Sequence, residues 1–290
     1  TGKNGQVGFE LQRALAPLGE VVAVDLPEWD LTETATIQRL LESVKPDVIV
    51  NPAAHTAVDK AESEPALAAA LNTDLPRHLG EYAAAHGCLV VHYSTDYVFD
   101  GEKSVPYVET DPTNPQNVYG QTKLAGERAL ADATDQHLIL RTSWVIGAHG
   151  NNFAKTMLRL AAERDSLSVV ADQWGVPTSA ALLADSTAHV VRAWQRQGPV
   201  DFPYGVYHLV PAGVTNWCDC ARFVVQQAID AGLSMRVLPE QIQAISTADY
   251  PTPARRPANS QLNTQKFRDT FGLLLPDWRQ GLSHLLKQVF

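Results

Sequence analysis

The chain has 290 residues, of which 45% are hydrophobic, and its 23 basic and 32 acidic side chains give a formal net charge of −9. This length is enough for one large α/β domain or two closely packed ones. No apolar run approaches the roughly 20 residues that a membrane-spanning helix needs, and the negative charge disfavours a broad nucleic-acid-binding surface. Only three cysteines occur, which suits a reduced, cytoplasmic protein, and we expect Cys218 and Cys220 to be ordinary helix residues rather than half of a metal site.

The chain opens with three glycines at a spacing typical of a dinucleotide-binding loop. Gly2, Gly5 and Gly8 form the pattern G-x-x-G-x-x-G, which lets the backbone approach a pyrophosphate at the positive N-terminus of the following helix. Such a loop normally follows a buried strand that is central in its sheet. Losing that strand would cost about 1 kcal/mol or more per backbone bond, against a total stability of about 5–15 kcal/mol. We therefore expect an apolar strand ahead of Thr1.

Helical and strand patterns alternate in the first half of the chain. In chain order we expect a helix at 7–18, a strand at 21–25, a helix at 34–44, a strand at 47–51, a helix at 64–87, a strand at 88–95, a helix at about 117–133 and a strand at 137–145. Strands that are continuous apolar runs between helices indicate a parallel sheet covered on both faces. With the glycine loop, they predict an α/β fold built on a Rossmann-type doubly wound parallel sheet.

The rhythm loosens beyond residue 146. In this half we expect helices at 151–164, 179–197 and 216–231, a strand at 204–210, a Pro-rich loop at 251–263 and a final helix. No repeat or low-complexity linker separates the halves, so the second half is expected to pack on the first as a smaller α/β cap. The predicted division is a dinucleotide-binding domain at 1–145, to which later segments return, and a mainly substrate-binding domain at 146–290, interleaved with it.

An acidic residue ends the second expected strand, where a dinucleotide site uses one. Asp25 lies 20 residues after Gly5, in a position to accept a hydrogen bond from the adenosine ribose; the alternative is a solvated strand terminus. By like-charge repulsion Asp25 disfavours a 2′-phosphate and so favours NADH. Because Lys3 in the opening loop could compensate, NADH and NADPH both stay open.

Tyr119 and Lys123 form the pattern Y-x-x-x-K at the start of an expected helix. This spacing places both side chains on one helical face. A free tyrosine has a pKa of about 10, and a nearby ammonium lowers that pKa and makes the phenol a better general acid. Alone, the pattern more often marks an exposed helix pair. Here Thr95 ends a predicted strand and can bring its hydroxyl to the phenol at the carboxyl edge of the sheet, where α/β folds bind ligands.

Further motifs follow in a characteristic order. They are N-P-A-A-H-T-A-V-D at 51–59, H-Y-S-T-D-Y-V-F-D-G at 92–101, Y-G-Q-T-K-L-A-G-E at 119–127, R-T-S-W-V at 141–145 and R-P-A-N-S-Q-L-N at 256–263. Together with the glycine loop, this series resembles the extended short-chain dehydrogenase/reductases, and within them the reductases of 4-ketosugars carried on dTDP. The likeness extends over nearly the whole chain.

The resemblance implies that the C4 ketone of dTDP-4-dehydro-L-rhamnose is reduced to dTDP-L-rhamnose by hydride from NADH or NADPH. It makes Tyr119 the proton donor, Lys123 the residue that holds the nicotinamide ribose and tunes Tyr119, and Thr95 the partner of the reacting oxygen. The expected cofactor-binding residues are Gly2, Gly5, Gln6, Val7, Gly8, Asp25, Asp30, Leu31, Ala54, His55, Thr56, Tyr93, Tyr119 and Lys123. The expected substrate-binding residues are Thr95, Asp96, Trp144 and Arg256.

Two of these substrate contacts also have a simple physical basis. The flat face of Trp144 can pack the methyl side of a deoxysugar while its N–H serves a hydroxyl, although a lone tryptophan at a strand end is more often a core residue. Arg256 is the candidate for the diphosphate because a guanidinium pairs with phosphate through two parallel hydrogen bonds; Arg255 is the alternative. For His55 we expect a backbone contact to the cofactor.

The sequence departs from the family pattern at several positions. Pro52 stands where a small alanine is usual, and Ile146 replaces a frequent tyrosine near Trp144. Some bacterial members join two subunits through glutamate-bound Mg²⁺. Glu10 fits one such ligand, but Ala181 occupies the place of another. A metal is therefore not expected, while a homodimer stays open.

Two rival functions remain at this stage. One is a related nucleotide-sugar epimerase or dehydratase, which would need a further acid and base, and S-T-D-Y offers only Asp96. The other is a non-catalytic NAD(P)-binding subunit, because the regulatory subunit of methionine adenosyltransferase has the same fold. The intact pair of Tyr119 and Lys123 disfavours that reading. In every case the predicted ligand is a small molecule, with no nucleic acid and no membrane as partner.

Overall fold

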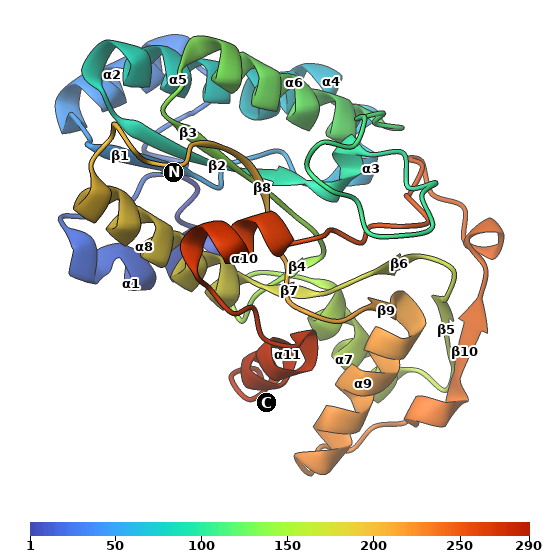
Figure 1. The fold of residues 1–290 in the computed structure, drawn as a ribbon. Coiled ribbons are helices and arrows are strands. Elements are labelled where there is room, and N and C mark those ends of the chain that lie inside the picture. The colour runs from blue at the N-terminus through green and yellow to red at the C-terminus, as the bar shows by residue number, and fades with distance from the viewer.

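The computed structural model describes residues 1–290 and is built around a four-stranded parallel sheet (Figure 1). Its strand order is β1-β2-β3-β8, with bounds β1 Val48–Asn51, β2 Leu89–Thr95, β3 His137–Thr142 and β8 Gly205–His208. Every residue of β2 is buried, as expected for a strand covered on both faces. The parallel sheet predicted from the apolar runs is confirmed, and its fourth strand comes from the second half of the chain.

Helices cover both faces of this sheet (Figure 1). One face carries α2 Thr34–Val44, α5 Leu75–His86 and α6 Val118–Ala133, and the other carries α1 Gln6–Leu15, α8 Ala180–Gln197 and α10 Gln265–Phe271. Each layer has its own apolar core: Leu79 and Leu130 pack with Ile139 on the first face, whereas Leu11 and Leu183 pack with Leu140 on the second. The doubly wound arrangement predicted for the chain is therefore present.

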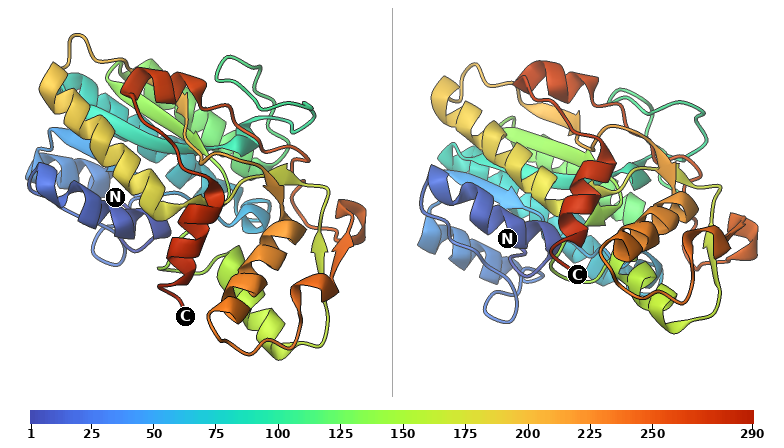
Figure 2. Two further views of the ribbon diagram at one scale, coloured as in Figure 1. Left: turned by 60° about the horizontal axis from the view of Figure 1, so that its bottom comes forward. Right: turned by 90° about the horizontal axis from the view of Figure 1, so that it is seen from below.

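A smaller lobe lies beside the sheet, as Figure 2 shows in two further views. It contains α7 Phe153–Glu163, α9 Trp217–Asp230 and α11 Trp278–Leu286, the parallel pair β5 Leu167–Val170 and β10 Ile242–Ile245, and the short pairs β4 Val145–Ile146 with β7 Thr178–Ser179 and β6 Trp174–Gly175 with β9 Thr215–Asn216. The sequence patterns predicted its helices but none of these short strands. The final helix that we expected is confirmed as α11, whereas α10, which precedes it after the Pro-rich loop, was not predicted.

The helix expected at 64–87 is interrupted by a π-helical turn. It consists of α4 Pro65–Ala69, the π-turn Ala70–Asp74 and α5; a further short helix, α3 Val58–Ala61, precedes it. Pro76 has no N–H to give to the carbonyl of Asn72, so a regular helical bond is missing there. A side chain at Gly126 would collide with that same carbonyl. The widened turn and the glycine together let α6 pack directly against Asn72.

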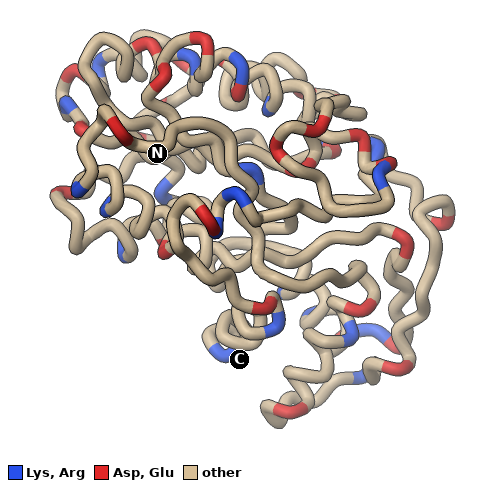
Figure 3. Tube along the Cα trace, viewed as in Figure 1, with Lys and Arg blue, Asp and Glu red and all other residues tan.

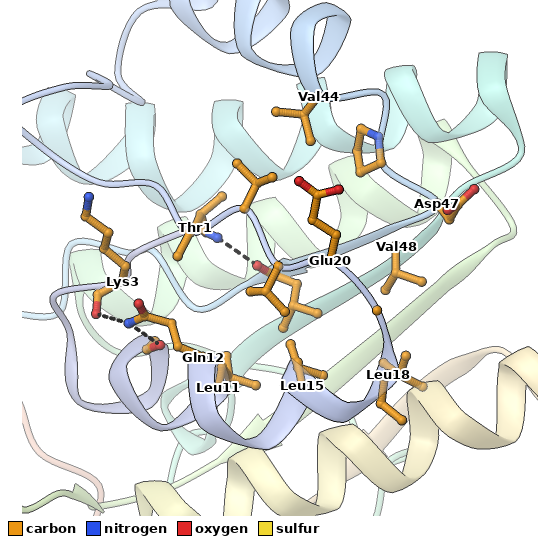
Figure 4. Close-up of a pocket in the computed structure, with 18 of the residues that line it drawn as sticks. Thr1, Lys3, Leu11, Gln12, Leu15, Leu18, Glu20, Val44, Asp47 and Val48 are labelled. Atoms are coloured by element: carbon orange, nitrogen blue, oxygen red, sulfur yellow. Dashed lines mark hydrogen bonds between the residues drawn. The ribbon is translucent and has the colours of Figure 1, made fainter.

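One expected strand is wrong. Residues 21–25 run without a strand partner, and Val21 and Val22 are 39% and 49% exposed. A cavity of about 540 Å³ separates this segment from β1 (Figure 4). It lies beside Thr1, whose amino group donates to the carbonyl of Val50 at 3.0 Å. A β-branched run forms a strand only when a neighbouring strand bonds to it. The strand expected ahead of Thr1 concerns residues outside this sequence and stays a prediction.

Charges of both signs are interspersed along the chain trace (Figure 3). Cys218 and Cys220 are buried in α9, which confirms that they are ordinary helix residues, and all three cysteines are free thiols. None of the helices combines the length and the apolar character that a bilayer span requires. The remaining short helical turns are Ala16–Leu18, Asp96–Val98, Pro239–Gln241 and Thr247–Asp249.

Candidate active site

The carboxyl ends of β1, β2 and β3 open into a cavity of about 890 Å³. Sixteen of the predicted site residues line it: Gly2, Gly5, Gln6, Val7, Gly8, Asp25, Asp30, Leu31, Ala54, Thr56, Tyr93, Thr95, Asp96, Tyr119, Lys123 and Trp144. The cavity therefore joins the glycine loop, the segment after residue 25 and the Y-x-x-x-K pair, although these lie far apart in the sequence. Ligands of open α/β sheets bind at this edge.

The glycine loop forms a tight cradle at the start of α1. Gly2 has a φ of +60°, a conformation that side chains disfavour. A Cβ at Gly8 would overlap the carbonyl oxygen of Gly2, so the loop can only close on a glycine there. No side chain caps α1, whose first turn begins at Gln6. Its N–H groups and helix dipole suit a phosphate, and the loop therefore fits the pyrophosphate of a dinucleotide.

The side chain of Gln6 joins this loop to the smaller lobe. Its Oε1 accepts hydrogen bonds from the backbone N–H of Gly147 at 2.7 Å and from Nδ2 of Asn152 at 3.0 Å, while its Nε2 donates to the carbonyl of Val145 at 3.3 Å. Gly150, Asn152 and their neighbours also line the cavity. This segment was not predicted as part of the site, because the sequence gives no sign that Gln6 reaches it.

Asp25 is already bonded to the backbone around it. Its carboxylate accepts from the N–H of Asn4 at 3.0 Å and from the N–H of Leu26 at 2.9 Å. Lys3 extends to Glu28, with 3.4 Å between Nζ and Oε2. The acid thus fixes the turn that borders the cavity, and it is itself one of the residues that line the cavity.

Tyr119 lies on the first turn of α6, which Asn117 caps by accepting from the N–H of Gly120 at 2.8 Å. Burial raises the pKa of Tyr119 to about 12, opposed by a hydrogen bond with the hydroxyl of Thr95 and reinforced by the charge of Asp96. The expectation that Lys123 lowers this pKa is therefore wrong for the protein without ligands. Lys123 is not among the groups that shift this pKa, desolvation is the largest cause, and the phenol stays protonated at neutral pH.

Lys123 is buried, with only 2% of its surface exposed, and its side chain turns toward β2. Its Nζ donates to the carbonyl of Tyr93 at 2.6 Å and lies 3.2 Å from Nε2 of His92. Burial lowers the pKa of Lys123 to about 8, while Glu127 one turn further along α6 raises it. The ammonium lines the floor of the cavity from a position that the strand fixes.

Thr95 and Asp96 form the polar corner next to Tyr119. The hydroxyl of Thr95 donates to Oδ1 of Asp96 at 2.9 Å, and both residues are buried. Oδ2 of Asp96 makes no hydrogen bond of good geometry, although Ser260 lies near the carboxylate. Burial raises the pKa of Asp96 to about 6, opposed by contacts with Ser260 and Thr95. A buried carboxylate oxygen without a partner on the wall of a cavity is suited to a hydroxyl of a ligand.

An aromatic stack forms a further part of the cavity wall. Trp144 stacks on Trp217 with 3.6 Å between ring centroids, and both line the cavity. Trp144 has a φ of +45°, which costs a bulky residue about 1–3 kcal/mol. A side chain at Gly175 would collide with its indole. The structure therefore holds this tryptophan in a strained conformation with one face against Trp217.

Two predicted residues do not line the cavity. His55 packs behind it: its ring Nε2 lies 3.0 Å from Oε2 of Glu64, and its backbone N–H donates to Oδ1 of Asn72 at 2.8 Å. Arg256 pairs with Asp59 at 2.7 Å and faces a separate depression of about 480 Å³ that Arg255 and Trp174 also line. The structure thus places both next to the site, one layer away from the cavity wall.

Several residues in and around the site were missed. Trp217 begins α9, 73 positions after Trp144, and nothing local in the sequence connects them. Tyr97 packs edge-on against Tyr119 at 5.5 Å between centroids. Asn72 bonds the backbone of His55 on both sides and donates to Thr122 at 3.1 Å. Only Asn72 had a usable signal, since a proline four residues further along a helix frees its carbonyl.

No group of three or more His, Cys, Asp or Glu side chains is arranged to hold a metal ion. Glu10 pairs with Arg13 at 3.3 Å, and Arg13 also reaches Asp185 on α8 at 2.8 Å. The carboxylates near Ala181 are thus engaged in ion pairs within the chain.

The sequence has close relatives. A family model described as "RmlD substrate binding domain" matches residues 1–290. The dTDP-4-dehydrorhamnose reductase of Shigella flexneri is 51% identical over 293 residues, which cover 100% of this chain and 96% of that protein. A Streptomyces antibioticus protein named as a probable dTDP-4,6-dihydroxy-2-methyloxan-3-one 4-ketoreductase is 38% identical over 291 residues, covering 100% and 94%.

Solved structures support the same family assignment as the sequence comparisons. The crystal structure of a dTDP-4-dehydrorhamnose reductase from Clostridium acetobutylicum has a TM-score of 0.88 at 36% identity, covering 99% of this chain and 96% of that one. The enzyme of the same name from Bacillus anthracis, in complex with NADP, has a TM-score of 0.87 at 33% identity, covering 99% and 97%. The chain therefore belongs to the RmlD substrate binding domain family, the family of the dTDP-4-dehydrorhamnose reductases that it matches along its whole length.

Proposed function

We propose that this chain reduces the C4 ketone of dTDP-4-dehydro-L-rhamnose to dTDP-L-rhamnose with NADH or NADPH. The observation that carries the proposal is one cavity that combines a dinucleotide cradle with Tyr119, Thr95 and Asp96 at its inner end. Full-length identity of 51% to a protein named for this reaction supports it. So does the NADP held by the similar enzyme from Bacillus anthracis.

Tyr119 is the proton donor in this proposal. When bound, the reduced nicotinamide would supply a hydride to the carbonyl carbon C4, and the carbonyl oxygen would take up the negative charge of an alkoxide. The phenol O–H bond then breaks, a new O–H bond forms on the sugar, and the tyrosinate regains its proton from solvent. Thr95 contacts the phenol and is placed to hold the reacting oxygen. A pKa raised to about 12 keeps the phenol protonated until negative charge develops next to it.

Lys123 supplies the positive charge of the site. One of its three N–H groups bonds the carbonyl of Tyr93 and another faces His92, so one remains for the cavity. We assign that donor to the nicotinamide ribose. The glycine loop and Asp25 would hold the pyrophosphate and the adenosine ribose, with Ala54 and Thr56 beside them.

The sugar and its nucleotide occupy the other end of the cavity. We assign the unpartnered oxygen of Asp96 to a sugar hydroxyl and the exposed face of Trp144 to the methyl side of the ring. Nη1 of Arg256 is buried without a partner, which supports a role toward the diphosphate if the loop that carries it adjusts. Residues 1–145 then hold the dinucleotide and the reacting groups, while residues 146–290 add Arg256 and the ring of Trp217 that supports Trp144 on the sugar side.

The proposal includes two statements about the setting of the enzyme. Three free, buried thiols suit the reducing cytoplasm. We assign the exposed outer side of α1 and α8, where Arg13 pairs with Asp185, to the contact with a second copy in a homodimer. Gel filtration with light scattering tests the second statement directly, and elution at the mass of a single chain would contradict it.

The test is a turnover assay. Purified protein is mixed with dTDP-4-dehydro-L-rhamnose and NADPH or NADH, and the absorbance of the reduced nicotinamide is followed. Repeated, stoichiometric oxidation is expected. An epimerase or dehydratase would convert nucleotide sugars without net oxidation of the cofactor, and a binding subunit would bind the cofactor without turnover of any ketosugar.

Tyr119→Phe is the matched variant. It should bind NADPH as tightly as the unchanged protein and lose about 10²–10⁴-fold in kcat, the contribution of a positioned general acid. Fluorescence of bound NADPH measures the first quantity and the absorbance assay the second. A variant with near-normal kcat would show that another group donates the proton.

A further inference from the structure

A histidine lies directly beneath Lys123 in the sheet. His92 is in the middle of β2, is completely buried, and does not line the cavity. Its Nε2 is 3.2 Å from Nζ of Lys123, and its Nδ1 is 3.0 Å from Nδ2 of Asn51, the last residue of β1. Asn51 is also completely buried and contacts the hydroxyl of Thr1 at 2.5 Å. A polar line thus runs from the cavity floor sideways through the sheet.

The hydrogen-bond roles along this line follow from the chemistry of its members. An ammonium only donates, so Nε2 of His92 must accept from Lys123. A neutral imidazole carries one N–H, which is then on Nδ1 and needs an acceptor. The amide of Asn51 provides one when a half-turn presents its oxygen to the ring. The opposite end of the amide then donates to the hydroxyl of Thr1. Both ring nitrogens of His92 are satisfied in this arrangement, whereas a protonated ring would direct an N–H at the ammonium of Lys123.

We propose that His92 is a positioning residue for Lys123, which holds the ammonium in its cationic form and directs its remaining N–H into the cavity. This inference rests on the proposed function, because it assigns that N–H to the cofactor. Asn51 fixes the tautomer that leaves Nε2 free to accept. The rotation of a long lysine side chain about several bonds is thereby limited by two fixed acceptors on β2, the backbone of Tyr93 and the ring of His92.

Three further ionisable groups lie around Lys123, and the charge state of each one follows from its surroundings. Glu127 on the same helix raises the pKa of Lys123 but is itself bound by Arg141 on β3, with 2.6 Å between Nη2 and Oε2. Tyr119 on α6 stays neutral at working pH because its pKa is raised to about 12. The pKa of His92 is lowered well below its usual value by burial and by Lys123, so the ring faces the ammonium uncharged. His92 is therefore the neutral acceptor among these groups.

Two substitutions distinguish the roles of the two ring nitrogens of His92. His92→Gln places a carbonyl oxygen near the position of Nε2 and keeps an acceptor for Lys123. His92→Asn places its oxygen near the position of Nδ1 and leaves Lys123 without that acceptor. Both side chains are polar and neutral, so their cost of burial is similar. A third variant, His92→Phe, keeps a ring at this position but has neither nitrogen. Thermal unfolding of each variant establishes that it is folded.

The readouts are the dissociation constant of NADPH and the kcat for the ketosugar, both between pH 6 and 10. NADPH binding should weaken at alkaline pH as Lys123 loses its proton. In His92→Asn and His92→Phe the ammonium lacks one hydrogen bond, so the pH midpoint of this weakening should fall by about one unit. We also expect a loss of about tenfold in kcat for these two. His92→Gln should keep most of both values.

The two proposals can fail separately. If the unchanged protein does not turn over the ketosugar, the proposed function is wrong, while the pH dependence of NADPH binding still tests His92. If His92→Gln and His92→Asn are folded and give the same pH midpoint and the same kcat, the positioning role is wrong and His92 serves only packing.

Discussion

The two walls of the cavity hold their functional side chains by different means. On the sheet side, His92, Lys123, Glu127 and Arg141 are buried charged or polar residues joined by hydrogen bonds. On the aromatic side, Trp144 and its partner are held by ring stacking. The sheet side lies between two helical layers, whereas the aromatic side belongs to the smaller lobe.

This difference separates two kinds of sensitivity. A buried charge that loses its partner keeps its full desolvation cost, so the sheet side should respond strongly to single substitutions. When one of two stacked rings is removed, the loss is limited to their contact area and to the modest interaction energy between the rings. We expect changes on the sheet side to affect stability and kcat, and changes on the aromatic side to affect mainly the KM for the sugar.

The largest effect should come from the ion pair beneath Lys123. Glu127 and Arg141 have side chains only 4% and 6% exposed and are joined by two short hydrogen bonds, from Nε at 2.9 Å and from Nη2 at 2.6 Å. Glu127→Gln leaves the guanidinium charged and buried without its counter-ion. The free energy of unfolding in urea should fall by about 3–5 kcal/mol.

An exposed pair of the same chemistry is the matched control. Arg159 and Glu163 on α7 are 59% and 58% exposed and 2.9 Å apart. Glu163→Gln should change the free energy of unfolding by about 0.5 kcal/mol or less, because water screens an exposed helical pair. Equal losses in the two variants would mean that burial does not distinguish the sheet side as we argue.

A second effect on the sheet side depends on pH. His208 at the end of β8 is buried beside Arg141, and both factors lower its pKa to about 3. The folded protein thus keeps this ring neutral where the unfolded chain, with a pKa of about 6.5, is protonated. Its contribution to stability is complete above pH 6.5 and is lost as the pH falls toward 3. The slope from this residue is about 1.4 kcal/mol per pH unit between those limits.

His208→Asn isolates that contribution. The amide nitrogen of asparagine replaces Nδ1, which lies 3.1 Å from the carbonyl of Tyr107. Urea unfolding at several values between pH 6 and 4 should give a shallower dependence for the variant than for the unchanged protein, by about 1.4 kcal/mol per pH unit. Parallel curves would show that His208 is already protonated in the folded state.

Much of the sheet side could be predicted from the sequence. The apolar run before Thr95 predicts a buried strand that ends at the site, and the spacing of Tyr119 and Lys123 puts both on one helical face. Such signals are local, since they depend on periodicity and on residues within one element. The helix expected at 34–44 is found at those bounds for the same reason.

The features that could not be predicted depend on distant contacts. The raised pKa of Tyr119 follows from burial in the assembled cavity, and no spacing in the sequence reports burial. The stack of Trp144 on Trp217 joins residues that lie 73 positions apart in the chain. The segment 21–25 has strand composition but no partner strand in the structure, and composition alone does not create a ladder. In each case the deciding quantity is the surroundings of a residue.

The smallest effect should come from the aromatic side. Trp217→Ala removes the ring that supports Trp144, and an aromatic pair contributes about 0.5–1.5 kcal/mol beyond its buried area. We expect the KM for the ketosugar to rise about two- to tenfold, with kcat and NADPH affinity unchanged, because the rings packed against Trp217 are Trp144 and Phe153, neither of which donates the proton. Trp194→Ala is the control and should leave KM unchanged, because the indole of Trp194 bonds the hydroxyl of Tyr204 outside the cavity.

A fall in kcat as large as that of Tyr119→Phe would contradict the division between the two walls. It would mean that the stack also sets the geometry of Tyr119, across the cavity and through the substrate. Steady-state kinetics on Trp217→Ala at saturating NADPH separates the two cases. A support role for the sugar changes KM alone, so the full rate returns at high concentrations of ketosugar. Coupling to the phenol lowers kcat, so the rate stays low even when the ketosugar is saturating.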